Sequence, residues 1–191
     1  MAIFFRGAGV DTYWHKNDAR LKGFLPHDPG KARTPSTIIN HIKNGTTNSP
    51  FVSLTRSYSI AWNYAAYSGY AAPTSAKPAY VYEIEIYDPL PMGLTVLDPI
   101  QEILKAFPSP LNGATYQHDG NTDFLMGIID PRGMATSLTT HIKTPPPGGA
   151  TPRPANLTSE LETIVRALRD SELLAIGAIP TNCITNRYEV Y

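Results

Sequence analysis

The chain has 191 residues, of which 42% are hydrophobic and 17% are charged, a composition that suits one globular domain with a substantial core. Its 16 Lys and Arg balance 16 Asp and Glu, so we do not expect the broad basic surface that non-specific nucleic-acid binding needs. Cys183 is the single cysteine, which excludes a disulfide within the chain. The first residues lack the features of a secretory signal, and no apolar run approaches the roughly 18 residues of a membrane span.

The sequence of the first third of the chain predicts two strands, each followed by a helix. Residues 2–5 predict a short strand, and the Gly-rich residues 6–9 predict a flexible turn after it. Residues 35–45 predict a helix that begins near a proline and ends at Asn-Gly. Residues 51–55, FVSLT, predict a second strand, and residues 57–69 predict a serine-capped helix.

The rest of the chain mixes strands and helices with many loops. Its 18 prolines, several of them within residues 144–154, favour short strands joined by long loops over a helical protein. Apolar periodicity predicts strands at 79–88, 123–130, 172–179 and 183–191, and helices at 98–107 and 156–170. The predicted class is therefore α+β, with residues 1–191 in a single domain.

Two predicted strand ends carry chemically useful side chains. Arg6 is followed by small residues, so its planar guanidinium could reach a phosphate while the backbone approaches a ligand. Ser53 and Thr55 lie on the same side of their predicted strand. Both features also have purely structural explanations, because a strand-end arginine is often solvated and Ser and Thr often prepare helix caps.

Two pairs of acids are spaced two residues apart. Asp170 and Glu172 come directly before an apolar segment, and in an extended backbone they would share one face. Two close carboxylates need a compensating cation, and such pairs are common in catalytic sites, although a charged turn after a helix explains them equally well. Glu83 and Glu85 alternate with apolar residues, which is typical of the solvent face of an edge strand.

Taken in chain order, these motifs resemble those of the mono-ADP-ribosyltransferases of the arginine–serine–glutamate group. This group includes the cholera- and pertussis-like toxins and the relatives of pierisin and scabin. The resemblance lies in FFRGAG at 4–9, FVSLT at 51–55, Asp170-Ser171-Glu172 and LLAIGAIP at 173–180. It implies a single ADP-ribosyltransferase-like domain with two small, mostly antiparallel sheets around an NAD cleft and a few flanking helices. Residues from about 108 to 155 form a loop or insert that the resemblance does not cover.

The chain departs from the pattern of that group at two positions. Leu54 stands where the Ser-Thr-Ser motif has its central threonine, whose side chain points away from the hydroxyl pair. Asp170 stands where the group has Gln or Glu, a residue that helps to orient the acceptor. The type of acceptor is therefore left open by the resemblance.

The resemblance implies NAD as the substrate, without a metal ion. Glu172 would stabilise the oxocarbenium-like ribose, as carboxylates do in glycoside hydrolysis, and Asp170 would orient the acceptor or act as general base. Ser53 is also assigned to the catalytic group, because it and Thr55 would hold the strand end and the glutamate in place. The residues expected to bind the dinucleotide are Arg6, Gly7, Ala8, Ser53, Thr55 and Tyr67, with Tyr70 and Tyr80 as alternatives for the aromatic ring that packs on nicotinamide.

The remaining polar candidates are scattered histidines. His15, His27 and His118 could help to shape a cleft, yet single histidines are more often surface or core residues. No metal-ligand spacing such as HExxH or CxxC occurs in the sequence. We therefore expect no metal site.

The implied biological setting is a bacterial toxin or defence enzyme that acts in the cytoplasm, alone or delivered as part of a longer effector. The acceptor would be a macromolecule, either a protein side chain or a nucleic-acid base, and a cognate antitoxin or immunity protein would be a second partner; no membrane is involved.

Two alternative functions stay open at this stage. One is a catalytically inactive module of the same fold that binds a nucleotide or a protein, and the other is an NAD glycohydrolase that uses water as the acceptor.

Overall fold

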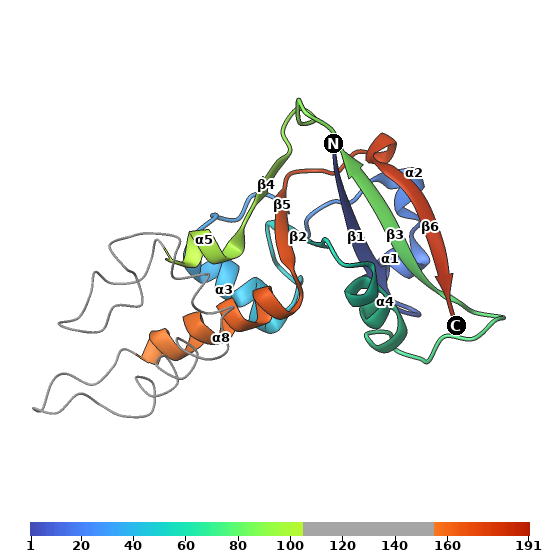
Figure 1. The fold of residues 1–191 in the computed structure, drawn as a ribbon, viewed down its shortest axis with the longest axis horizontal. Coiled ribbons are helices and arrows are strands. Elements are labelled where there is room, and N and C mark those ends of the chain that lie inside the picture. Colours follow the sequence, from blue (N-terminus) through green and yellow to red (C-terminus); the bar gives the residue numbers. More distant parts are fainter. Residues whose placement is uncertain (105–154) are drawn as a thin grey trace, which may run out of the picture.

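Six short strands, each with at least one apolar face, pair into an antiparallel sheet in the computed structural model, which describes residues 1–104 and 155–191 (Figure 1). The order across this sheet is β4-β5-β2-β1-β3-β6. The strands are β1 Ala2–Ala8, β2 Phe51–Thr55, β3 Ala79–Ile86, β4 Thr95–Leu97, β5 Glu172–Ile176 and β6 Ile184–Val190. The helices of the described residues are α1 Tyr13–Lys16, α2 Ala19–Lys22, α3 Pro35–Asn44, α4 Tyr58–Tyr67, α5 Pro99–Leu104 and α8 Ala155–Arg169, with a 3-10 turn η1 Thr181–Cys183. The predicted α+β class is confirmed.

The sheet consists of two three-stranded halves that meet at a single residue pair. β1 and β3 pair along seven positions, and β2 and β5 pair along five. Between β1 and β2, by contrast, one residue pair is formed, in which Phe5 lies opposite Thr55. The prediction of two separate small sheets is therefore wrong, because this one pair joins the halves, but the halves remain distinct.

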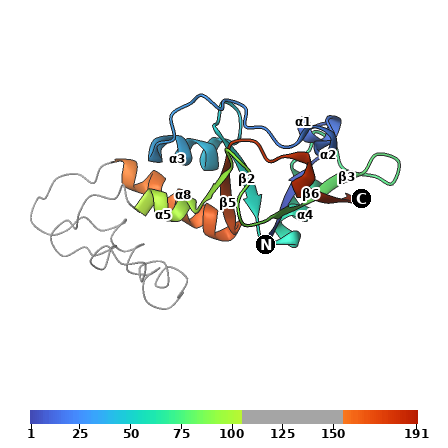
Figure 2. The ribbon, with the colours of Figure 1, turned by 90° about the horizontal axis from the view of Figure 1, so that it is seen from above.

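The β4-β5-β2 half is covered by α3, α5 and α8, which lie beside it in both views of the ribbon (Figures 1 and 2). The three helices share a buried cluster with the strands, which contains Ile38, Phe51, Ile100, Ile103, Ile164, Ala167, Leu174 and Ile176. The local signals for these helices are clear in the sequence. The side chain of Thr34 caps α3 before Pro35, and the Asp98 carboxylate accepts the Ile100 N–H at the start of α5.

The β1-β3-β6 half packs against α4, which lies directly on Gly7. A Cβ atom at position 7 would be 2.2 Å from the Ala61 carbonyl oxygen and 2.7 Å from the Ala65 nitrogen. The glycine thus lets the helix backbone touch the strand, and β1 continues to Ala8. The predicted turn at 6–9 is wrong for this reason: Gly7 serves close packing within a strand.

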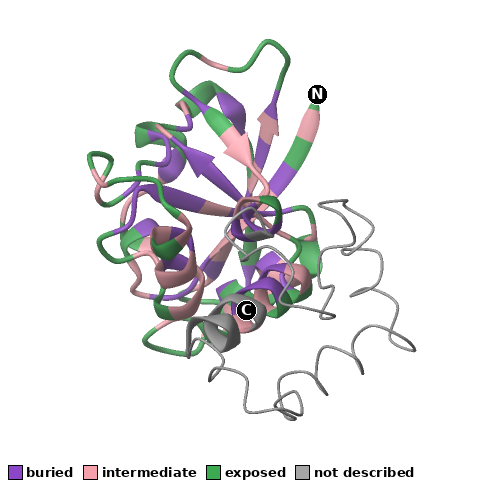
Figure 3. Ribbon diagram, turned by 90° about the vertical axis from the view of Figure 1, so that its left-hand side faces the viewer, coloured by how far each residue is buried: buried purple, intermediate pink, exposed green. Residues whose placement is uncertain are grey.

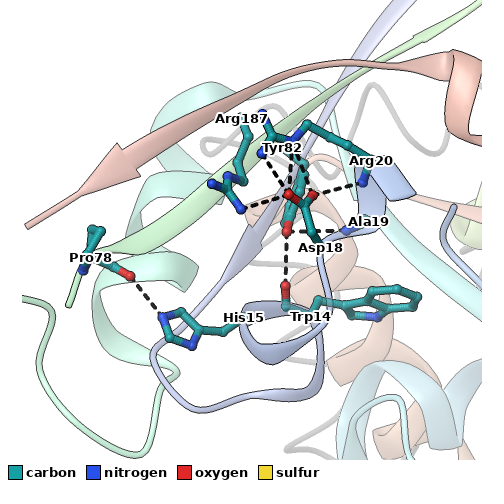
Figure 4. Close-up of polar contacts among 8 residues, drawn as sticks. All are labelled: Trp14, His15, Asp18, Ala19, Arg20, Pro78, Tyr82 and Arg187. Atoms are coloured by element: carbon teal, nitrogen blue, oxygen red, sulfur yellow. Dashed lines mark hydrogen bonds and ion pairs between the residues drawn. The ribbon is translucent and has the colours of Figure 1, made fainter. Parts of the chain in front are cut away.

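On the other side of this half, hydrogen bonds attach α1 and α2 to the sheet (Figure 4). The buried Tyr82 hydroxyl donates to the Trp14 carbonyl at 3.0 Å and accepts the Ala19 N–H at 3.4 Å. Asp18 receives hydrogen bonds from Arg20 at the start of α2 and from Arg187 of β6. These contacts fix α1, which carries Tyr13 and Trp14.

Buried residues are concentrated along the strands (Figure 3). The predicted strand at 172–179 is shorter than expected, since β5 ends at Ile176 before Gly177, whose φ is +88°. Glu83 and Glu85 lie on β3, which is an interior strand and not the predicted edge strand. The predicted strand at 123–130 and loop at 144–154 lie outside the described residues. Within the described residues, no helix is long and apolar enough to span a bilayer.

Candidate functional site

A cavity of about 600 Å³ lies between β1 and β2, the strands at which the two halves of the sheet meet. Its walls come from β1, α1, α3, β2, α4 and the turn between α8 and β5. Seven of the predicted site residues line it: Arg6, Gly7, Ala8, Ser53, Thr55, Asp170 and Glu172. The fold therefore brings together residues from three distant parts of the chain.

Arg6 contributes a guanidinium with spare hydrogen-bonding capacity to the cavity. Its Nη1 donates to the Ser53 carbonyl oxygen at 2.6 Å, and its side chain lies 5.6 Å from the centre of the Phe24 ring. Its Nε is buried and is without a hydrogen-bond partner among the described residues. Burial lowers the pKa of Arg6 to about 10, although the charge of Glu172 opposes this shift. The side chain stays cationic at neutral pH and can still donate to an acceptor in the cavity.

Glu172 is the first residue of β5 and lies opposite Thr55 of β2. Its side chain is only 11% exposed. Burial raises the pKa of Glu172 to about 7, the hydrogen bond with the Ser53 side chain lowers it, Asp170 raises it, and Arg6 lowers it. A small change in surroundings can therefore change the charge of this carboxyl group near neutral pH.

His41 is a site residue that the sequence analysis missed. It is 2% exposed, and its Nε2 lies 2.8 Å from the Ser53 Oγ and 3.7 Å from Glu172 Oε1. Burial, assisted by the charge of Arg6, lowers the pKa of His41 to about 3. The contact with Glu172 is therefore one between a neutral imidazole and a carboxyl group, not an ion pair. The sequence did contain a signal that His41 is buried, because it follows Ile38 by three residues and therefore lies on the apolar side of the helix.

Asp170 is held by its neighbours in a way that the sequence did not suggest. Its Oδ2 accepts the Tyr64 hydroxyl at 2.6 Å, and Arg169 binds both carboxylate oxygens at 2.6 and 2.7 Å. Burial would raise the pKa of Asp170, but the hydrogen bonds from Arg169 and Tyr64 outweigh it, and the pKa is lowered. The expectation that Asp170 and Glu172 share one face of an extended segment is wrong, because Ser171 between them has φ +46° and forms a turn.

Thr55 links the end of β2 to this turn. Its hydroxyl donates to the Asp170 carbonyl oxygen at 2.6 Å and accepts the Ser57 N–H at 3.1 Å. The threonine therefore fixes the backbone directly before Glu172 and also helps to start α4. Ser53, two residues earlier, contacts the imidazole of His41 instead.

The aromatic wall of the cavity is formed by Tyr64 and Tyr70 on one side and by Tyr13 and Trp14 on the other. Tyr67, which was predicted to bind the dinucleotide, does not line the cavity, so the structure does not bring it together with the other predicted residues. Its side chain is 79% exposed and packs on Trp62, because Tyr67 lies about 60° around the helix from Tyr64. Burial raises the pKa of Tyr64 to about 12, so its hydroxyl remains a donor.

The other candidates from the sequence lie in different places. His27 lines the cavity near Tyr13, whereas His15 stacks on Tyr80 and contacts the Pro78 carbonyl oxygen away from it. His118 lies outside the described residues. No group of three His, Cys, Asp or Glu in residues 1–104 and 155–191 could hold a metal ion.

Comparisons with known proteins give no family for this chain. No protein-family model matches it, and a search of curated proteins finds none with significant similarity.

Proposed function

We propose that this protein is an NAD-dependent mono-ADP-ribosyltransferase that transfers ADP-ribose to a macromolecular acceptor, as a toxin or defence enzyme. The observation that carries the proposal is the convergence in one cavity of Arg6, Ser53 and Glu172, which come from three separate sequence motifs. The cationic guanidinium of Arg6, which lines the cavity, supports an anionic ligand such as a diphosphate. The carboxyl group of Glu172 suits the other end of NAD, since its nicotinamide ring is cationic.

In the proposed reaction the bond between ribose C1′ and the nicotinamide nitrogen breaks. The electron pair of that bond neutralises the nicotinamide ring, which leaves, and C1′ develops oxocarbenium character. The ionised Glu172 stabilises this charge in a partly dry cavity, where a carboxylate acts more strongly than in water. The acceptor then forms the new bond to C1′ and releases its proton to solvent or a base.

The position of Asp170 bears on what the acceptor is. A general base needs a carboxylate that is free to take a proton, whereas this one is bound by both Arg169 and Tyr64. This occupancy favours hydrolysis of NAD, with water as the acceptor, as the second candidate function. In either case we assign Asp170 to holding the turn before Glu172.

The proposal is tested by incubating the protein with NAD that is labelled in its adenylate part, in the presence of a cell lysate. The transferase predicts release of nicotinamide together with label on macromolecules, and treatment with protease or nuclease identifies the acceptor class. Release of nicotinamide without retained label would establish the glycohydrolase. Binding of NAD without any release would establish an inactive binding module.

Glu172→Gln supplies the matched test of the chemistry. This change keeps the shape of the side chain and removes its charge, so nicotinamide release should fall by about 100- to 1,000-fold. Glu83→Gln is the control, because Glu83 lies on β3 outside the cavity and contacts Tyr188 and Thr185. Equal activity in the two variants would contradict the assignment of Glu172.

A further inference from the structure

Ser49 is a buried serine to which neither the motifs nor the proposed reaction assigns a role. It is 2% exposed and lies just before β2, and its Oγ is 2.6 Å from His41 Nδ1. The same Oγ accepts the Phe51 N–H at 3.2 Å. On the opposite side of the imidazole, His41 Nε2 meets Ser53 Oγ at 2.8 Å. A series of hydrogen bonds therefore links the Phe51 N–H of β2 through Ser49 and His41 to Ser53, and the same His41 Nε2 lies 3.7 Å from Glu172 Oε1.

Counting the protons on these groups shows in which direction each hydrogen bond donates. An ionised Glu172 carries a negative charge, and its Oε1 lies 3.7 Å from His41 Nε2, so this charge favours the imidazole proton on Nε2. Ser53 Oγ, 2.8 Å away, then accepts from that N–H. Since His41 is neutral, its Nδ1 is a bare acceptor, and only the Ser49 hydroxyl is placed to donate to it.

The opposite direction leaves groups unsatisfied. If His41 carried its proton on Nδ1, Ser49 Oγ would accept from both His41 and Phe51, and its own buried proton would be without a partner among the contacts that the structure describes. The lone pair of a bare Nε2 would also lie 3.7 Å from the Glu172 carboxylate oxygen, which is an unfavourable contact between two acceptors. Burial makes such unsatisfied donors costly, so the first direction is favoured.

We propose that Ser49 is a positioning residue that fixes His41 as the Nε2–H tautomer, so that this N–H faces the Glu172 carboxyl group and favours its ionised form. This inference deepens the proposed function, on which its catalytic meaning rests. The direction in which these hydrogen bonds donate is a property of the folded protein, so it can be measured without turnover.

Other groups also act on the carboxyl of Glu172 and stay constant in the test. They are Arg6 of β1, Tyr64 of α4, and Arg169 and Asp170 at the end of α8. None of these four has a hydrogen bond to Ser49 in the described structure. A change at Ser49 therefore reaches Glu172 through His41.

The experiment compares Ser49→Ala with Ser49→Thr, which keeps a hydroxyl, and with Ser36→Ala, a control on the exposed first turn of α3. The ¹⁵N resonances of His41 are recorded at pH 8, with His15 as an internal reference because its Nε2 faces a carbonyl oxygen. Wild type should show the neutral Nε2–H form with a hydrogen-bonded Nδ1. Ser49→Ala should lose that Nδ1 signature, and Ser49→Thr should retain it. An Nδ1–H form in the wild type would overturn the proposal.

The second readout is the titration of the Glu172 carboxyl group, followed by ¹³C resonance in the free protein. Without a fixed Nε2–H of His41 beside it, the Glu172 carboxyl group should have a pKa about one unit higher in Ser49→Ala, and Ser36→Ala should leave this pKa unchanged. If nicotinamide release is observed, the acidic limb of its pH profile should shift upward by the same amount. An unshifted Glu172 in a folded Ser49→Ala variant would overturn the role of Ser49, whereas a wild type without any turnover would instead overturn the proposed function.

Discussion

The hydrogen bond between Tyr64 and Asp170 gives a sharp test of how this site is held together. Asp170→Asn keeps the shape of the side chain and removes its charge. The carboxylate is 12% exposed and accepts Tyr64 at 2.6 Å, so loss of its charge-assisted hydrogen bond should cost about 1.5–3 kcal/mol. The pair with Arg169 adds little, since that guanidinium is 63% exposed and solvent screens it. We therefore expect the free energy of unfolding to fall by about 2 kcal/mol.

The control is a similar hydrogen bond at the surface. The Tyr188 hydroxyl donates to Glu83 at 2.7 Å, but this contact is exposed, so Glu83→Gln should change the stability by less than about 0.5 kcal/mol. Urea unfolding at pH 7 measures both variants. A double-mutant cycle between Tyr64→Phe and Asp170→Asn then isolates the pair and should give a coupling of about 1 kcal/mol or more. Equal losses in Asp170→Asn and Glu83→Gln would refute the reasoning.

The pH dependence of this contribution follows from its sign. The folded state lowers the pKa of Asp170, so the stabilisation is present above the ordinary pKa of about 3.9 and is lost as the pH falls through the lower folded value. The difference in unfolding free energy between wild type and Asp170→Asn should therefore shrink in acid. A difference that stays constant down to pH 2 would show that the charge of Asp170 is not what stabilises the turn.

Three further predictions concern the cavity and its walls. Gly7→Ala places a Cβ 2.2 Å from the Ala61 carbonyl oxygen and should cost about 3 kcal/mol in urea unfolding, whereas Gly30→Ala, whose nearest neighbour is 3.9 Å away, should be almost neutral. The pKa of Glu172 is raised from 4.5 to about 7 in the folded state, so the free energy of unfolding should decline by up to about 3 kcal/mol as the pH rises across this range. If Glu172→Gln showed the same decline with pH, the raised pKa of Glu172 would be contradicted. Arg6→Lys keeps a charge but loses the planar guanidinium that suits phosphate oxygens, so calorimetry should show NAD binding weakened about 10- to 100-fold; undiminished affinity would exclude Arg6 as a ligand of NAD.

Features of the fold that depend on near neighbours along the chain could be predicted from the sequence. Apolar alternation predicted the strand at 79–88, and the structure places β3 at Ala79–Ile86. Capping residues predicted the starts of α4 at Ser57 and of α5 at Asp98. Periodicity predicted a helix at 156–170, and α8 spans Ala155–Arg169. Each of these signals acts within one or two turns of chain, where propensity and capping chemistry decide the backbone.

Which side chains meet in the cavity depends on how distant segments of the chain pack together. The sequence placed Arg6, Ser53 and Glu172 at element ends, but His41 and its partner Ser49 have no local pattern that distinguishes them from core residues. Tyr64 and Tyr67 are equally plausible from spacing, and the direction in which each faces depends on how α4 packs on Gly7. The packing of that helix is set by contacts between distant segments.

The same reason explains why the sheet and the role of Asp170 were not predicted. One bridge between Phe5 and Thr55, 50 positions apart in the numbering, joins two halves that local patterns describe as separate. Asp170 is bound by Tyr64, which is 106 residues away, and its two-residue spacing from Glu172 is altered by the turn at Ser171. Predictions from side-chain periodicity assume a regular backbone, which the turn at Ser171 interrupts. Hydrogen bonds between distant residues depend on the whole fold, so the bonding of Asp170 could not be derived from the order of residues alone.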